Sequence, residues 1–230
     1  MACVLGIETA TPLLSVAIVG PEGLRAERAA FGERLHSVRL FPFIEELLRD
    51  AGTHLEDLNG IAVSQGPGSF TGLRLGVVTA KTLAQVCTLP VIGIPTLLAL
   101  AAPLLSGGIP VCPVIISRSD EVYAAAYAAA DPEATLLVAP FAAPPAEAAQ
   151  KFASLAKLLL TGEGAWAFRE VFTEILGERA LFAPKVFNYP RATTVAFLGR
   201  QKLARGAAVT PFDLLPEYLR LPAIKGRRGT

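Results

Sequence analysis

A glycine-rich run at residues 64–74, Ser-Gln-Gly-Pro-Gly-Ser-Phe-Thr-Gly-Leu-Arg, joins a strand to a helix with almost no chain between them. The apolar residues 60–64 predict the strand, and residues 71–86 predict the helix. Gly66 and Gly68 permit the tight turn, and Ser69 or Thr71 can cap the helix by accepting a backbone N–H. Such a turn can cradle a phosphate, or it can pack a helix closely on a sheet.

The run matches neither common nucleotide-binding pattern, because a Walker A loop ends in Gly-Lys-Ser/Thr and the dinucleotide fold needs an acid about 20 residues further on. Glu8 ends the first expected strand, where an acid can hold a metal-bound water or simply be solvated. The candidate residues for anion or nucleotide binding are Glu8, Thr9, Gly66, Gly68 and Ser69.

The helix expected over 71–86 is apolar around an arc of about 200°, which is wider than one sheet contact requires. Gly72, Gly76, Ala80 and Ala84 recur every four residues. One side of the helix therefore carries only small side chains and can approach another backbone closely. Either this helix has a second packing surface, or it is wholly internal to the chain.

Composition limits the classes of function. The chain has 230 residues, is 52% hydrophobic and carries a net charge of +1, so it can bury a large core and has no overall basic footprint for nucleic acid. Its three cysteines lack metal-ligand spacing, and His36 and His54 lie too far apart for a helical metal motif. We therefore expect no metal site. The amino terminus does not resemble a secretory signal, so we expect a cytoplasmic protein with reduced thiols.

Short strands alternate with helices, which is typical of an α/β fold. Prolines and glycines divide the uncharged stretch between Lys81 and Arg118, which argues against a membrane span. The expected strands lie at 4–9, 13–19, 24–31, 60–64, 89–94, 111–116 and 157–161, and the expected helices at 36–51, 71–86, 95–105, 145–153, 165–176 and 193–205. The first three strands form an antiparallel meander, and the helices that follow cover one face of a mixed sheet. Residues 123–127 fit either a helix or a hairpin strand.

Several segments together resemble the TsaB family, the dimerisation subunits of bacterial tRNA threonylcarbamoyladenosine synthesis. They are residues 7–17, His36 with Leu40 and Pro42, and residues 64–74, 121–123 and 216–220. The resemblance implies the actin-like and Hsp70-like ATPase fold, with two βββαβα-type domains of which the second is degenerate, and a hairpin over 111–117 and 121–128. It implies an amino-terminal domain at 1–105 with a returning segment at about 210–224, and a smaller domain at 106–209.

The same resemblance implies a non-catalytic subunit that binds TsaD, the enzyme that transfers the threonylcarbamoyl group to the adenosine beside the anticodon. TsaE is the ATPase of that system, and tRNA would be met through the complex. Family members use the helices matching 36–51 and 71–86 to form a helical bundle with TsaD, and a homodimer through the same helices is an open alternative. The implied partner interface comprises His36, Leu40, Ile44, Leu47, Gly72, Leu73, Gly76, Val77, Ala80 and Leu83.

The resemblance implies no intrinsic cofactor and no catalytic residue, with ATP or ADP conceivable at the complex interface. Leu40 stands where the second histidine of TsaD's metal motif would lie, and Glu8 and Ser117 stand where the family usually carries aspartate. The alternative function is an ATP-dependent small-molecule kinase or ATPase of the same superfamily, whose second phosphate loop only residues 161–164 approach. The basic cluster at 225–228 fits a phosphate contact or a solvated tail.

Overall fold

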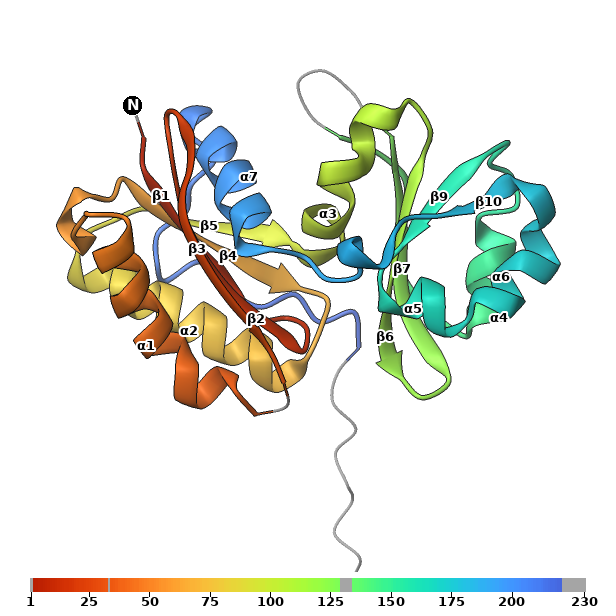
Figure 1. The fold of residues 1–230 in the computed structure, drawn as a ribbon, viewed down its shortest axis with the longest axis horizontal. Coiled ribbons are helices and arrows are strands. Elements are labelled where there is room, and N and C mark those ends of the chain that lie inside the picture. Colours follow the sequence, from red (N-terminus) through yellow and green to blue (C-terminus); the bar gives the residue numbers. More distant parts are fainter. Residues whose placement is uncertain (1, 33, 129–133, 221–230) are drawn as a thin grey trace, which may run out of the picture.

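The computed structural model describes residues 2–32, 34–128 and 134–220, which form two lobes, each built on a five-stranded sheet (Figure 1). In the first lobe the strand order is β3-β2-β1-β4-β5. Strand β2 is antiparallel to both β1 and β3, whereas β4 and β5 run parallel to β1. The strands are β1 Val4–Glu8, β2 Leu13–Gly20, β3 Gly23–Phe31, β4 Gly60–Gly66 and β5 Val91–Pro95.

The second lobe repeats this topology, with the order β8-β7-β6-β9-β10 and the same alternation of antiparallel and parallel pairs. Its strands are β6 Val111–Arg118, β7 Glu121–Ala128, β8 Thr135–Ala143, β9 Leu158–Thr161 and β10 Ala180–Phe182. The last strand has only 3 residues, so the repeat is reduced in size. The expected α/β architecture of two related units is confirmed.

Helices cover both faces of the first sheet (Figure 1). Helices α1 (His36–Asp50) and α2 (Phe70–Val86) pack on one face. Helix α7 (Ala192–Ala204) comes from far along the chain and packs on β1 and β4 from the other face. The expectation that helices cover one face only is wrong, because the helix that covers the second face is supplied by the carboxy-terminal part of the chain.

The lobes are joined by α3 (Thr96–Ala101) and a 3-10 turn (Ala102–Gly107). The second lobe adds α4 (Pro145–Lys151), α5 (Glu163–Ala167) and α6 (Arg169–Leu176). One continuous helix was expected over 165–176, but Phe168, at φ −110° and ψ 29°, leaves helical geometry and divides it. Further 3-10 turns lie at Leu55–Asp57, Gly177–Arg179 and Lys185–Phe187.

Residues 123–127 lie in β7, so the hairpin with β6 is confirmed and the helical alternative is wrong. Ala124 and Ala126 are fully buried in the same cluster as Phe152, which follows α4. Burial and pairing in the sheet therefore outweigh the helical preference of alanine. Strands β8 and β10 were not anticipated.

After α7 the chain returns along the first lobe, where Val209 pairs with Val91 of β5 and Leu214 enters the core. The domain boundaries given above stay a prediction. Residues 221–224 of the returning segment and the basic cluster at 225–228 lie outside the described residues. Within the described part of the chain, no helix is long and apolar enough to cross a membrane.

Candidate functional site

A cavity of about 590 Å³ lies where the two lobes meet. Its walls are the turn after β1, the glycine-rich turn after β4, the end of β6, the start of α5 and residues 217–220. Among the candidate anion-binding residues, only Gly68 and Ser69 line it.

The glycine-rich turn is held tightly against the rest of its lobe. Ser69 donates its N–H to the Ala10 carbonyl oxygen at 2.8 Å, and its Oγ accepts the Gly72 N–H at 3.2 Å. The predicted cap at Ser69 is therefore confirmed. Gly66 has φ +132°, and a Cβ there would overlap the carbonyl oxygen of Glu217, so only glycine suits this position.

Residues 212–220, which we name the strap, cover the outer side of this turn. Gln65 accepts the Glu217 N–H at 2.7 Å through its backbone carbonyl, and its side-chain amide donates to the Leu215 carbonyl oxygen at 2.9 Å. Lys81 of α2 donates to the Leu214 carbonyl oxygen at 3.0 Å. The chain itself thus occupies the space beside Gly66 that an anion would need.

The end of the strap connects both lobes. The Tyr218 ring lies 5.2 Å from the Phe70 ring, and its hydroxyl accepts the Arg74 Nε–H at 3.1 Å. Arg220 then forms an ion pair with Glu121 of β7 at 2.5 Å. The strap therefore fixes the second lobe to the first across the mouth of the cavity.

Glu8 and Thr9 serve the packing of the first lobe. Glu8 is fully buried, and its carboxylate accepts the Ser64 hydroxyl and, at 2.6 Å, the Ala10 N–H. Burial raises the pKa of Glu8 to about 7. The hydrogen bonds from Ser64 and Ala10 act in the opposite direction and lower it. Thr9 is also buried and donates its hydroxyl to the Gly72 carbonyl oxygen at 2.8 Å. The interpretation of Glu8 as a solvated strand-end acid is wrong.

Glu163 is the acid that the cavity does present. It follows Gly162 at the start of α5, and its Oε1 accepts the Ile116 N–H at 3.2 Å. Its Oε2 is buried without a hydrogen-bond partner. Burial raises the pKa of Glu163 to about 7. Burial also raises the pKa of Tyr189, which lines the same cavity, and the Glu163 charge adds to that rise.

Glu163 can therefore accept a hydrogen bond from a group entering the cavity, or exchange a proton with it near neutral pH. Sequence reasoning noticed residues 161–164 only as an incomplete phosphate loop. The available signal was a glycine followed by an acid at a strand end. This local pattern alone did not indicate a role for Glu163.

His36 lies outside this arrangement. Its Nε2 is 2.9 Å from the Thr11 carbonyl oxygen, and burial lowers its pKa. Leu40, one turn further along α1, is buried in the core. Across residues 2–32, 34–128 and 134–220, no group of three or more His, Cys, Asp or Glu side chains could hold a metal ion.

Comparison with known proteins relates this geometry to a family. The family model described as TsaD, tRNA N6-adenosine threonylcarbamoyltransferase, matches residues 29–226. The tRNA threonylcarbamoyladenosine biosynthesis protein TsaB of Bacillus subtilis (strain 168) is 28% identical over 225 residues, covering 95% of this chain and 94% of the relative. The chain belongs to the TsaB family.

Solved structures agree with this assignment. A Pseudomonas aeruginosa protein described as uncharacterized, with similarity to peptidase YeaZ, superposes with a TM-score of 0.83 at 31% identity, covering 96% of this chain and all (100%) of that one. The ROK hexokinase of Thermus thermophilus shares the fold alone, with a TM-score of 0.52 at 12% identity over 87% of this chain and 99% of the hexokinase. The actin-like and Hsp70-like fold is thus confirmed for this TsaB-family chain.

Most residues of the implied TsaB interface lie inside this chain. Eight of the ten are buried: Leu40, Ile44, Leu47, Gly72, Leu73, Gly76, Val77 and Ala80. Only His36 and Leu83 keep appreciable exposure. The small residues of α2 face the first sheet, since a Cβ on Gly72 would overlap the Thr9 carbonyl oxygen and one on Gly76 the Thr9 hydroxyl. Buried side chains do not reach a partner, so contact must be sought on their exposed neighbours.

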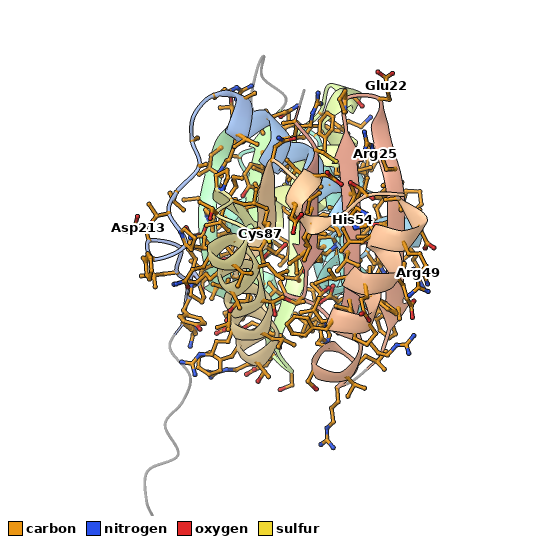
Figure 2. All side chains as sticks on the ribbon, turned by 90° about the vertical axis from the view of Figure 1, so that its left-hand side faces the viewer. Glu22, Arg25, Arg49, His54, Cys87 and Asp213 are labelled. Atoms are coloured by element: carbon orange, nitrogen blue, oxygen red, sulfur yellow. The ribbon has the colours of Figure 1, made fainter. Side chains whose placement is uncertain are left out.

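The same two helices also carry large apolar side chains that are exposed, and we call this set of residues the outer helix face. It consists of the exposed Val38, Phe41, Val78 and Val86. The half-buried Leu48 and Leu75 lie on the same helices. Figure 2 shows the first lobe from this side, with Arg49 on α1, Cys87 just beyond α2, and Asp213 of the strap beside α2. None of Val38, Phe41 and Val78 is among the interface residues that the family resemblance implied.

Proposed function

We propose that this chain is a non-catalytic subunit of bacterial tRNA threonylcarbamoyladenosine biosynthesis that binds TsaD through its outer helix face. The observation that carries the proposal is a TsaB relative along 95% of the chain, together with four exposed large apolar residues on two adjacent helices. Large apolar side chains left exposed on neighbouring helices are candidates for contact with a partner, because the core of the protein is already filled without them. A role in tRNA modification would place the protein in the cytoplasm.

The family model supports TsaD as the partner. It spans residues 29–226 and therefore includes α1 and α2, so proteins of the TsaD family are expected to carry counterparts of both helices. Two such helix pairs can pack face to face as a four-helix bundle around a pseudo-twofold axis. A total buried area of about 1,600 Å² would be ordinary for a stable complex. The same arrangement would give a homodimer when TsaD is absent.

Three local features support a non-catalytic role. The strap covers Gly66, the carboxylate of Glu8 is held by Ser64 and Ala10, and His36 contacts the Thr11 carbonyl. These three groups, which could serve nucleotide or metal chemistry in the first lobe, are thereby engaged within the chain. We assign the transfer chemistry to TsaD, with TsaE, tRNA and any ATP or ADP joining through the complex.

Sedimentation of this chain with the TsaD of the same organism tests the interface. Val78→Arg and Phe41→Glu place charges on exposed positions, so both variants should fold and bind TsaD at least about tenfold more weakly. Val186→Arg is the matched control, because Val186 in the second lobe is as exposed (76%) as the residues of the outer helix face. Wild-type affinity in both outer-face variants would contradict the proposal.

The alternative of an ATP-dependent kinase or ATPase is favoured by one observation, the cavity of about 590 Å³ with the unpartnered Glu163 oxygen. Calorimetry of the isolated chain with ATP and magnesium separates the two functions. Binding with turnover, both lost in Glu163→Gln, would favour the enzyme. If the isolated chain gave no heat of ATP binding, and activity appeared only when TsaD was added, the result would favour the subunit.

A further inference from the structure

A second cavity, of about 470 Å³, lies away from the interlobe cavity and from the outer helix face. It is bounded by the β2–β3 hairpin, by α3 with its following 3-10 turn, and by α7. Helices α3 and α7 are in contact, and Figure 1 shows them facing each other between the lobes. We call this cavity the α3–α7 pocket. Because α7 covers the face of the first sheet opposite α1 and α2, a partner on the outer helix face would leave the pocket open.

The pocket has apolar walls and a cationic end. Leu24, Leu98, Leu105 and Phe197 supply large apolar side chains from four different elements. Leu24 and Phe197 are exposed at 52% and 48%, so apolar surface remains uncovered at the rim. A volume within about 300–1,000 Å³ and mainly apolar walls are typical of small-molecule sites.

The cationic groups of the pocket lie at the carboxy-terminal end of α7. Lys202 and Arg205 line one end, and the described residues that line the pocket (from 2–32, 34–128 and 134–220) include no Asp or Glu. The Lys202 ammonium makes a long contact of 3.4 Å with the Gly93 carbonyl oxygen, which leaves it donors for a ligand. Glu27 is the nearby acid on the Thr193 side, and Arg191 already pairs with it at 2.7 Å. The pocket therefore favours an anionic group at its Lys202 end.

Thr193 and Lys202 of α7 both line the pocket and give its length along the helix. The hydroxyl oxygen of Thr193 is buried without a hydrogen-bond partner, and Thr193 lines the pocket. Thr193 and Lys202 lie nine positions apart on α7, so they are separated by about 14 Å along the helix. An elongated molecule could therefore extend along this length of α7.

We propose that the α3–α7 pocket binds a small amphipathic anion, an elongated apolar body with one carboxylate or phosphate held by Lys202. Its body packs on Leu98, Leu105 and Phe197, and its head group replaces the long contact of Lys202 with Gly93. A ligand there contacts the first lobe, the interlobe connection and α7 together, so its binding stiffens the junction between the lobes.

Calorimetry of the full chain with decanoate, decan-1-ol and decylamine, each below its aggregation concentration, tests this site. Decanoate should bind saturably with one molecule per chain, and decan-1-ol about tenfold more weakly, since a hydrogen bond to a charged group contributes about 1.5–3 kcal/mol. Lys202→Gln should abolish the preference for decanoate over decan-1-ol. Decylamine binding as tightly as decanoate would contradict the proposal.

Two variants separate the pocket from adsorption to other apolar surface. Ala102→Trp fills the cavity, and Phe197→Asp puts a negative charge at its exposed rim, so either should lower decanoate affinity at least about tenfold. Val186→Ala, at an exposed apolar site in the second lobe, should leave it unchanged. Thermal unfolding establishes that each variant folds. No saturable binding, or wild-type affinity in the folded pocket variants, would overturn the proposal.

Discussion

The two lobes share one topology, yet the turns after their fourth strands differ. Gly66 ends β4 with φ +132°, and Gly162 directly follows β9 with φ +103°. The first turn opens into the 17-residue α2 and is covered by the strap, whereas the second opens into the 5-residue α5 and leaves Glu163 at the cavity. A repeated backbone can therefore serve close packing in one lobe and leave a reactive carboxyl in the other.

The largest loss of stability is expected from a substitution at Gly66, in the turn that the strap covers. Gly66→Ala forces a side chain onto positive φ and against the Glu217 carbonyl, so it should lower the free energy of unfolding by about 3 kcal/mol. Urea titration followed by circular dichroism measures this. Gly52→Ala is the matched control, because Gly52 also has positive φ but open space around it, and it should cost only about 1 kcal/mol. Equal losses would mean that the strap does not press on the turn.

The second turn predicts a pH effect. The pKa of Glu163 rises from 4.5 to about 7 on folding, so the folded chain binds the proton more tightly than the unfolded chain. The contribution of this tighter proton binding to the free energy of unfolding is complete below about pH 4.5 and is lost as the pH rises through about 7. Glu163→Gln keeps an acceptor for the Ile116 N–H and stays neutral. It should exceed the wild type in stability at pH 8 by up to about 3 kcal/mol, and less at pH 5.

Glu8→Gln is the corresponding change in the first lobe. The Glu8 carboxylate accepts two hydrogen bonds, whereas an amide offers one oxygen and one nitrogen in their place. Its gain at pH 8 should therefore be smaller than that of Glu163→Gln. Denaturant titrations from pH 5 to 8 compare the pair, and a larger gain from Glu8→Gln would contradict the distinction between a closed and an open turn.

The smallest effect concerns the link between the lobes. Arg220→Ala removes the ion pair with Glu121, whose side chain is 9% exposed and keeps the Ser117 hydroxyl as a partner. Because Arg220 itself is half exposed, the loss of global stability should be about 1 kcal/mol or less. Hydrogen exchange should nevertheless quicken at the Glu217 N–H. Unchanged exchange there would show that Arg220 does not hold the strap.

Local patterns predicted most of the first lobe, since its strands are apolar runs between turn residues and α1 and α2 are strongly periodic. Ser69 was recognisable as a cap because capping depends on neighbours in sequence. Strand β8 was harder to find, because Pro140 interrupts it and most of its residues are not fully buried. Strand β10 is too short to give any periodic signal.

The parts of the site that escaped prediction depend on contacts between distant residues. Gln65 and Leu215 are 150 positions apart, and the local sequence around neither residue predicts that they form a hydrogen bond. The small residues of α2 predicted a close approach correctly, but the sequence could not say whether the sheet or a partner approaches. The structure assigns that side to the sheet, through Thr9 and Val63. The exposed Val78 then becomes the better candidate for contact with a partner.

The most direct test of the proposed role is threonylcarbamoyl transfer to tRNA by TsaD and TsaE, measured with and without this chain. Activity should depend on the chain, be retained with Val186→Arg, and fall with Val78→Arg in proportion to the loss of TsaD binding. Full transfer without the chain, or full support by a Val78→Arg variant that no longer binds TsaD, would contradict the assignment as a partner subunit.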